Sequence, residues 1–484
     1  MNTYLGIDVG TSGTKALLTD SRGAVVRTAS AEYPLSTPKN GWAEQHPHLW
    51  RDAAARTIRE ILRGADAADI KCVGLTGQMH GLVALDKSGE VIRPALLWCD
   101  QRTAAECGEI TAKIGAERLI ELTANPALTG FTSPKILWLR NNEPENYAKI
   151  AKIMLPKDYI RWLLTGENAS DLSDASGTGL LSVADRRWSP EVLRALDVPR
   201  EWLGALYESP EITGRVSRLG AELTGLREGT PVAAGAGDNA AAAVGTGVTR
   251  DGEAFVTIGS SGVVFAHASE MRFDARGRVH TFCAAVPGEW HVMGVTLAAG
   301  LSLKWFRDNF APDASYAELD RLAGTVPIGA DGVTFLPYLN GERTPHLDPA
   351  ARGAFLGLSS SHTRAHLARA VLEGVVYSLR DCYDVIRGTG ADFAEITACG
   401  GGSVSPLWRQ MLADALAVPV VTAQSAEGPA LGAAILAAVG AGEYASVPEA
   451  SAAIIRKNPS AAPDPAASAR YAAAHAAYRG YYRR

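Results

Sequence analysis

The chain has 484 residues, of which 47% are hydrophobic and 20% are charged, and its formal net charge is −5. This size and composition exclude a largely disordered protein and favour two domains with buried cores. Because charges of both signs are mixed along the chain, the sequence lacks the basic footprint of proteins that bind nucleic acid or anionic membranes.

The N-terminus and the cysteines predict a cytoplasmic protein. No basic segment followed by a long apolar run stands at the start, and no apolar run is long enough to span a membrane. The six cysteines contain no CxxC pair, which fits neither a disulfide framework nor a zinc site. We therefore expect reduced thiols.

Residues 4–18 predict a strand, a tight turn at Gly10-Thr11-Ser12-Gly13 and a second strand. Side chains alternate along a strand, so Asp8 shares a face with Gly6 and Gly10. A carboxylate between two glycines is open to a ligand. The alternative is an ordinary hairpin whose glycines only provide positive φ.

Apolar periodicity then predicts helices over 48–62, 104–114 and 144–150, and a strand over 72–75 that leads into Gly77-Gln78-Met79-His80-Gly81. Further on, an apolar strand breaks at glycines and an alanine-rich helix begins at Asp238. Asp238 has two interpretations: it caps the helix, or it meets a ligand through the space that its small neighbours leave.

A second strand, turn and strand over 254–266 repeats the first design, with Gly259-Ser260-Ser261-Gly262 at the turn. The offset is 259 − 10 = 249 residues, about half of the chain. This correspondence predicts two related domains that face each other across a cleft, each presenting backbone N–H groups and hydroxyls to one ligand. Thr257 stands where the first hairpin has Asp8, so the halves differ in chemistry.

The remaining chain predicts a long helix over 366–386, a strand over 395–398 and a helix through Trp408 and Met411. Gly400, Gly401 and Gly402 lie between the last two and, with 428–432, give bare backbone suited to a flat base and a sugar. A tight βα turn is equally compatible with them. Residues 458–467 predict a surface linker and 471–484 a terminal helix.

Familiar phosphate and hydrolase motifs are absent. The sequence has no GxxxxGK[ST] loop, no GxGxxG after a strand and no GxSxG elbow. P-loop, Rossmann dinucleotide and α/β-hydrolase sites are therefore disfavoured.

Five motifs together resemble the FGGY carbohydrate kinases, and among them most of all the bacterial members that act on D-xylulose. The resemblance covers nearly the whole chain in the right order. Two longer family signatures accompany these motifs, at 130–142 and 353–373. The five motifs are Gly6-Ile7-Asp8-Val9-Gly10-Thr11-Ser12, Gly77-Gln78-Met79-His80-Gly81, Leu155-Pro156-Lys157-Asp158-Tyr159, Gly237-Asp238-Asn239-Ala240 and Gly341-Glu342-Arg343-Thr344-Pro345-His346.

The resemblance implies an α/β, two-domain actin/hexokinase-like (ribonuclease H-like) fold with an ATP and sugar cleft between the domains. Residues 1–248 would form the N-terminal kinase domain, with the sugar pocket, the first phosphate hairpin and the catalytic aspartate. Residues 249–455 would form the C-terminal domain, with the second phosphate hairpin and the adenosine site. Residues 456–484 would be a linker and the C-terminal helix.

The resemblance also implies ATP-dependent phosphorylation of D-xylulose to D-xylulose 5-phosphate, with ATP and Mg²⁺. Asp238 would be the catalytic base, and Asp8 would hold Mg²⁺ through water. The sugar would contact Met79, His80, Trp98, Asp238 and Asn239. The residues implied for ATP are Thr11, Ser12, Gly13, Gly259, Ser260, Ser261, Gly262, Gly400, Gly401 and Gly402. Ser260 replaces the threonine usual in the family but keeps a hydroxyl.

Two alternatives stay open at this point. One is another FGGY kinase, acting on ribulose, gluconate or glycerol. The other is a non-catalytic nucleotide-switch ATPase of the same superfamily, which would need no sugar pocket. The expected partners are a sugar and ATP, with no nucleic acid and no membrane, and a homodimer is possible.

Overall fold

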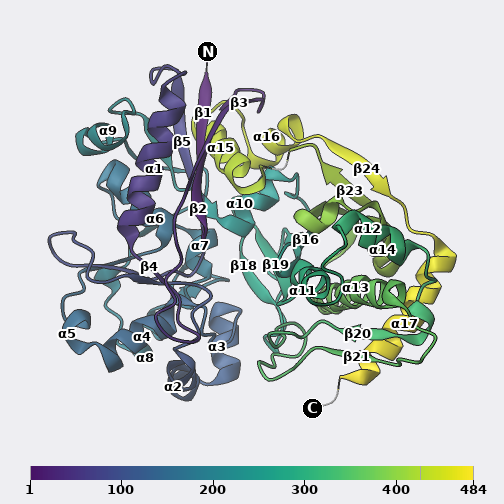
Figure 1. Ribbon diagram of the computed structural model, residues 1–484. Coiled ribbons are helices and arrows are strands. Elements are labelled where there is room, and N and C mark those ends of the chain that lie inside the picture. Colours follow the sequence, from purple (N-terminus) through teal and green to yellow (C-terminus); the bar gives the residue numbers. More distant parts are fainter. Residues whose placement is uncertain (1, 426, 483–484) are drawn as a thin grey trace.

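The computed structural model describes residues 2–425 and 427–482, and the chain forms two halves that lie side by side (Figure 1). Each half is built on one mixed sheet. The first sheet has the order β13-β14-β5-β1-β2-β3, and a further short strand, β15, also pairs with β5. Its strands are β1 (Thr3–Val9), β2 (Gly13–Asp20), β3 (Val25–Glu32), β5 (Ile70–Gly77), β13 (Ile212–Arg215), β14 (Pro231–Ala233) and β15 (Ala236–Gly237).

The second sheet has the order β18-β19-β17-β16-β22-β23-β24. Its first hairpin repeats that of the first sheet. β1 pairs with β2 antiparallel and with β5 parallel, and β16 pairs in the same way with β17 and β22. The predicted duplication is therefore present in the topology. The strands are β16 (Gly252–Ile258), β17 (Gly262–Ala268), β18 (His280–Cys283), β19 (Trp290–Thr296), β22 (Phe393–Cys399), β23 (Val420–Ala423) and β24 (Lys457–Ala461).

Helices surround both sheets, and five small two-stranded sheets lie outside them. The small sheets pair β4 (Glu44–Gln45) with β7 (Ala95–Leu96), β6 (Val83–Leu85) with β8 (Lys152–Met154), β9 (Ala169–Asp171) with β12 (Ala205–Tyr207), β10 (Leu181–Ser182) with β11 (Arg187–Trp188), and β20 (Thr334–Leu336) with β21 (Ala354–Leu356). The helices of the first half are α1 (Pro47–Leu62), α2 (Ala104–Ile114), α3 (Ala116–Thr123), α4 (Thr132–Asn142), α5 (Pro144–Tyr147), α6 (Pro156–Thr165), α7 (Leu172–Ser176), α8 (Pro190–Leu196), α9 (Arg218–Thr224) and α10 (Asp238–Gly245). Those of the second half are α11 (Gly300–Phe310), α12 (Tyr316–Gly324), α13 (Arg364–Gly388), α14 (Pro406–Leu416), α15 (Gly428–Gly440), α16 (Val447–Ile454) and α17 (Pro465–Tyr481).

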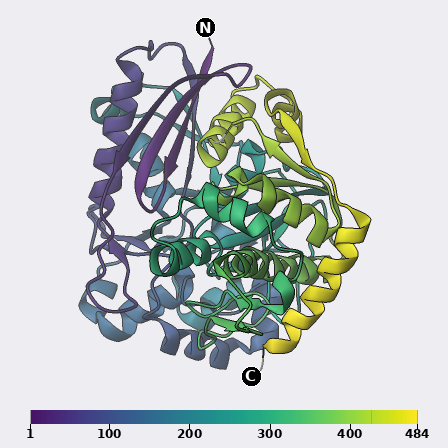
Figure 2. The same ribbon diagram turned by 45° about the vertical axis from the view of Figure 1, so that its right-hand side comes forward.

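The C-terminal segment differs from the expected linker over 458–467. Residues 457–461 form β24 on the edge of β23, and α17 already begins at Pro465 and runs along the outer edge of the second half (Figure 2). An edge strand tolerates Pro459, because a proline need not donate to a ladder on its open side. The last two residues of the predicted terminal helix, 483–484, lie outside the described residues.

Most of the predicted helices are present. The bounds of α2 are those predicted, α1 starts one residue earlier than predicted, and α13 starts two residues earlier. The helix expected over 144–150 is shorter. It ends at Tyr147, because the chain must then turn to enter β8, and the Ala151 N–H donates to the Leu85 carbonyl at 2.8 Å on the way.

Two helices from different halves meet at the junction between the sheets. α10 starts at Asp238, directly after β15, and α15 packs on it and on β1 and β5 (Figure 1). Glycines allow this close approach. A Cβ on Gly432 would lie 1.9 Å from the Ala241 carbonyl oxygen, and one on Gly245 would lie 1.9 Å from the Gly428 oxygen. The helix that begins with Asp238 is therefore fixed by the other half of the molecule.

We expect Gly432→Ala to destabilise the protein by about 1–3 kcal/mol, because the added methyl group meets backbone that cannot yield locally. Urea unfolding followed by circular dichroism measures this change. Gly388→Ala is the matched control, since a Cβ there meets nothing within 4 Å. Equal midpoints for the two variants would contradict the close packing of α10 and α15.

The cysteines form no disulfide bond, as the sequence predicts. All six cysteines are free, and three of them are buried. Among residues 2–425 and 427–482, no helix is long and apolar enough to cross a membrane.

Candidate active site

Asp8 and Asp238 lie at the same edge of the first sheet. Asp8 is opposite Thr76 on β5, and Gly237, the residue before Asp238, is opposite Gly77 on the other side of that strand. β1, β5 and β15 run parallel, so their carboxyl ends meet, which is where ligands bind in open α/β sheets. Two carboxylates that are 230 residues apart in the sequence (238 − 8) thus become close neighbours.

One carboxylate oxygen of Asp8 has no hydrogen-bond partner. Its Oδ1 is buried and accepts no hydrogen bond. Burial, and then the charge of Asp238, raise the pKa of Asp8 to about 7, while Lys15 acts in the opposite direction. An orphaned carboxylate oxygen beside a second carboxylate fits a hard divalent cation such as Mg²⁺.

The two carboxylates would occupy only a small part of the coordination shell of Mg²⁺. Within the described part of the chain, no cluster of three or more histidine, cysteine or acidic side chains could hold a metal. Mg²⁺ in nucleotide sites is usually bound by one or two carboxylates, with water and substrate phosphates completing the shell. The residues present therefore fit an ion that arrives with a nucleotide.

Asp238 is the first residue of α10, and its carboxylate is oriented by the next residue. Oδ1 accepts from the Asn239 backbone N–H at 2.8 Å and from Asn239 Nδ2 at 3.1 Å. Burial raises the pKa of Asp238 to about 6, and the two bonds from Asn239 oppose this rise. The other oxygen, Oδ2, accepts no hydrogen bond from the described residues.

A buried ionic cluster supports the segment just before Asp238. Lys157 Nζ lies 2.7 Å from Asp158 Oδ1, 2.7 Å from Asp171 Oδ1 and 3.5 Å from Asp174 Oδ2. Asp171 Oδ2 accepts from Ser173 Oγ, which in turn accepts from the Gly237 N–H at 3.1 Å. The backbone just before Asp238 is thus tied to the start of α7 through the hydrogen bonds of Ser173 and Asp171.

The same cluster contains one carboxyl group that is poorly paired. Both oxygens of Asp174 lack a hydrogen bond, and the side chain is wholly buried. Burial first, and the neighbouring carboxylates next, raise the pKa of Asp174 well above its usual value, against the attraction of Lys157.

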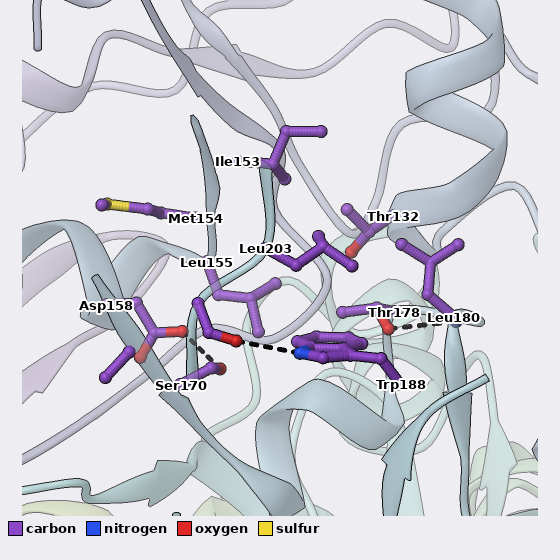
Figure 3. A pocket seen from close by; sticks show the side chains of 12 residues that line it. Thr132, Ile153, Met154, Leu155, Asp158, Ser170, Thr178, Leu180, Trp188 and Leu203 are labelled. Atoms are coloured by element: carbon purple, nitrogen blue, oxygen red, sulfur yellow. Dashed lines mark hydrogen bonds between the residues drawn. The ribbon is translucent and has the colours of Figure 1, made fainter. Parts of the chain in front are cut away.

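Figure 3 shows a cavity beside Asp158, where Ser170 Oγ donates to Asp158 Oδ2 at 2.6 Å. The cavity there is lined mostly by apolar side chains, among them Leu155, Leu180 and Trp188, and its volume is about 20 Å³. That volume holds about one water molecule. It is a packing gap behind the cluster and not a substrate pocket.

Met79 and His80 line the junction between the halves. His80 has a φ of 68°, a left-handed conformation that costs energy in a residue with a side chain. Its carbonyl accepts from Thr132 Oγ1 at 3.1 Å and from the buried Lys135 Nζ at 2.9 Å, which holds the strained backbone. Burial, and then the charge of Lys135, lower the pKa of His80 to about 3, so the ring is neutral.

The tautomer of His80 follows from its neighbour. Nδ1 lies 2.7 Å from the carbonyl oxygen of Gly177 and must donate to it. Nε2 is therefore an acceptor, suited to a hydroxyl group. Rings from both halves surround it: Phe131 stacks on His80 at a centroid distance of 4.7 Å, and Phe282 of β18 lies at 6.0 Å.

Trp98 and Thr11 are connected to each other. Trp98 is 40% exposed, and its Nε1 donates to Thr11 Oγ1 at 3.0 Å. That hydroxyl donates in turn to Gln78 Oε1 at 3.1 Å. The Thr11 side chain is thus occupied by the protein, whereas the exposed Ser12 hydroxyl makes no hydrogen bond among the described residues.

A larger cavity, of about 660 Å³, opens beside the second hairpin. It is lined by Gly259 and Ser260, by the start of α11, by α12 and by the segment 401–408. Gly401 has free space around it, since a Cβ there would meet nothing within 4 Å, while Gly400 and Gly402 pack on Ile258. The size and the bare backbone suit an adenosine-sized ligand.

Several residues that contribute to the site could not be identified from the sequence. Asp171, Ser173 and Asp174 were not distinguished by spacing, and Lys135 and Lys157 appear only inside longer motifs. The one available hint is that these charged residues stand in segments that are otherwise apolar, since charged side chains are rarely buried unless they are paired.

Comparison with known proteins shows the family of the chain. The N-terminal domain model of the FGGY family of carbohydrate kinases matches residues 3–245, and the C-terminal domain model of that family matches residues 254–441. A xylulose kinase of Escherichia coli strain K12 is 43% identical over 447 residues, covering 92% of this chain and 92% of that protein. A xylulose kinase of Bacillus subtilis strain 168 is 39% identical over 459 residues, covering 94% of this chain and 92% of that protein.

The fold is shared as well. The crystal structure of xylulose kinase from Rhodospirillum rubrum superposes with a TM-score of 0.94 at 33% identity, covering 99% of this chain and 98% of that one. The resemblance drawn from the sequence motifs and the expected two-domain actin/hexokinase-like fold are confirmed. With both domain models matched in order along nearly the whole chain, the protein belongs to the FGGY family of carbohydrate kinases.

Proposed function

We propose that this protein transfers the terminal phosphoryl group of ATP to the C5 hydroxyl of D-xylulose, giving D-xylulose 5-phosphate and ADP. The observation that carries the proposal is the position of Asp238, at the start of α10 and at the same sheet edge as Asp8, with the neutral His80 also lining the junction of the halves. The substrate is inferred from relatives of 39–43% identity that are named xylulose kinases.

The proposed chemistry needs one base and accurate positioning. The C5 oxygen attacks the γ-phosphorus, the bond to the β,γ-bridging oxygen breaks, and the hydroxyl proton passes to Asp238. Because the transition state of phosphoryl transfer is loose, most of the catalysis comes from alignment and charge stabilisation. Asn239 fixes Oδ1 of Asp238, so that the free Oδ2 faces the hydroxyl.

Asp8 is the residue that would hold Mg²⁺, through water, with the phosphates of the nucleotide completing the shell. When bound, the ion neutralises the charge that develops between the β- and γ-phosphates. Asp8 itself supplies the buried, unpartnered Oδ1 to which such a water would donate.

We assign the two hairpins to the phosphates. Ser12 and Gly13 on one side and Ser260, Ser261 and Gly262 on the other would donate from hydroxyls and backbone N–H groups, as in other turns that bind anions. Thr11 would contribute through its backbone, since Gln78 already accepts from its hydroxyl. The adenosine would lie along Gly400–Gly402 in the cavity of about 660 Å³.

We assign the sugar pocket and Asp238 to the N-terminal domain, residues 1–248, and the adenosine site to the C-terminal domain, residues 249–455. Met79, His80 and Trp98 would contact the sugar. His80 Nε2 would accept from one sugar hydroxyl, because Nδ1 donates to Gly177. We place the reaction in the cytoplasm, where the six free cysteines stay reduced.

The decisive experiment is an ADP-release assay with D-xylulose, D-ribulose, D-gluconate and glycerol as acceptors. We expect D-xylulose to give the highest kcat/KM. A higher kcat/KM for another acceptor would assign a different substrate, and ADP release that is indifferent to every acceptor would indicate a nucleotide switch.

The acid limb of the pH profile tests the base. A protonated Asp238 cannot accept the hydroxyl proton, and burial raises the pKa of Asp238 to about 6. With Mg²⁺ and ATP saturating, so that the ion keeps Asp8 ionised, we therefore expect kcat/KM for the sugar to be constant above about pH 7 and to fall about tenfold per pH unit well below about pH 6. The assay uses the coupling enzymes in excess at each pH. A profile that stays flat to about pH 4.5 would exclude a base with this pKa.

A further inference from the structure

Two peptide groups at the tip of the first hairpin are oriented by hydrogen bonds to their carbonyl oxygens. The Gly10 carbonyl accepts from the Tyr33 hydroxyl at 2.6 Å. The Thr11 carbonyl accepts from Gln45 Nε2 at 2.7 Å. Because the C=O and N–H of one planar trans peptide group point to opposite sides of the chain, the N–H groups of Thr11 and Ser12 are directed away from these two side chains.

The same two N–H groups have no acceptor in the protein. Within residues 2–425 and 427–482, the backbone N–H groups of Thr11 and Ser12 donate no hydrogen bond. Successive backbone N–H groups that point out of a turn form a binding site for anions. The first turn is therefore oriented for an anion by the protein alone.

The second hairpin has the same orientation but obtains it from backbone donors. The Gly259 carbonyl accepts from the Gly300 N–H at 2.7 Å. The Ser260 carbonyl accepts from the Ala299 N–H at 2.9 Å. A side-chain substitution cannot remove these donors, which belong to the backbone at the start of α11. In the first hairpin the corresponding donors are side chains, so its orientation depends on which residues supply them.

Gln45 is buried, and its amide can adopt one orientation only. Its Oε1 accepts from Trp50 Nε1 at 3.0 Å and from Gln78 Nε2 at 3.1 Å. Its Nε2 donates to the Pro34 carbonyl at 3.2 Å in addition to the Thr11 carbonyl. Exchange of the amide oxygen and nitrogen would place donors against donors and acceptors against acceptors. Gln45 is therefore a fixed donor towards the turn.

We propose that Gln45 is a positioning residue of the ATP site, which holds the Thr11 carbonyl towards the protein so that the Ser12 N–H is presented to the phosphate chain. This inference rests on the proposed function, which assigns the hairpins to the phosphates, and it adds a residue from outside the hairpin. Without this donor, the peptide group between Thr11 and Ser12 is free to rotate and to turn its carbonyl towards the phosphates. A carbonyl oxygen in that place repels an anion.

The test compares a ligand that has phosphates with one that has none. Wild type and Gln45→Met are titrated calorimetrically with ATP and Mg²⁺ and, separately, with adenosine. Methionine is similar in size to glutamine and uncharged, but it cannot donate to the Thr11 carbonyl. We expect Kd for ATP to rise roughly 10–100-fold and Kd for adenosine to change by less than about threefold. In the coupled assay, KM for ATP should rise while KM for D-xylulose changes by less than about threefold.

A second variant applies the same test without disturbing the buried amide. Tyr33→Phe keeps the ring and removes the hydroxyl that donates to the Gly10 carbonyl. Gln78 Nε2 remains 3.4 Å from that carbonyl, so a smaller rise in Kd for ATP is expected, roughly 3–10-fold, again with adenosine unaffected. This variant decides the test if Gln45→Met does not fold. Gln424→Met, at an exposed position, is the matched control and should bind both ligands as wild type does.

Three results would overturn the inference. The first is a folded Gln45→Met, or in its place Tyr33→Phe, with the ATP affinity of wild type. The second is an equal loss of affinity for ATP and adenosine, which would mean a general disturbance of the nucleotide site. The third is a raised KM for D-xylulose with an unchanged KM for ATP. A wild type that binds ATP no more tightly than adenosine, or that does not phosphorylate D-xylulose, would instead refute the proposed function, so the two failures are distinguishable.

Discussion

Asp238→Asn is expected to reduce kcat roughly 10²–10⁴-fold, the usual contribution of a positioned general base, and to leave ATP binding intact. Asparagine keeps the shape of the side chain and its contact with Asn239, but its amide cannot take the hydroxyl proton. Single-turnover phosphorylation of D-xylulose measures the chemical step, and calorimetry measures ATP binding. A variant that retains more than about a tenth of the wild-type kcat would exclude Asp238 as the base.

The same variant gives an independent check on its own folding. The pKa of Asp238 in the folded protein, about 6, lies above its ordinary value of 3.8, so ionisation of this buried carboxyl disfavours the folded state. That cost develops as the pH rises from the ordinary value through about 6 and is complete above it. At about pH 8, asparagine removes the cost, and the variant should unfold at a temperature no lower than wild type. Asp52→Asn, at an exposed position, controls for the change of residue type and should leave both rate and stability unchanged.

Asp8→Asn is the second change with a large expected effect. It removes the charge that would orient Mg²⁺ through water, and outer-shell partners of this kind contribute roughly 10–100-fold to metal affinity or activity. We expect the Mg²⁺ concentration for half-maximal rate to rise by that factor, with a low rate even at saturation. Binding of Mn²⁺ in the presence of ADP, followed by electron paramagnetic resonance, should weaken in parallel.

One experimental result would contradict this prediction. If Asp8→Asn gives the wild-type metal titration in both the rate assay and the resonance experiment, the metal role of Asp8 is wrong. A lowered rate with unchanged Mn²⁺ binding would mean that Asp8 acts through its neighbour Asp238, whose charge raises the pKa of Asp8. The acid limb of the pH profile of the variant would then shift.

Local patterns in the sequence were sufficient for the hairpins and most of the helices. Alternation and glycine spacing predicted both glycine turns, and the repeat of the first turn at Gly259 predicted two related sheets. These features depend on residues near one another in the chain, for which backbone conformation and periodicity are good guides. The prediction of a linker at 458–467 was wrong because β24 forms by pairing with the edge strand β23. The composition of a segment does not show whether a distant strand is available for pairing.

The sequence by itself determined the fold family, the two glycine turns and the two aspartates, because each is encoded in short motifs whose spacing the chain preserves. Only the tertiary structure decided which groups surround them. Lys157 in the ionic cluster before Asp238 and Gly177 beside His80 come from distant segments, and their effect on charge and hydrogen bonding depends on distances that exist only after folding. Burial, which gives Asp8 and Asp238 their raised pKa values, is likewise a property of the packed molecule and of no local pattern.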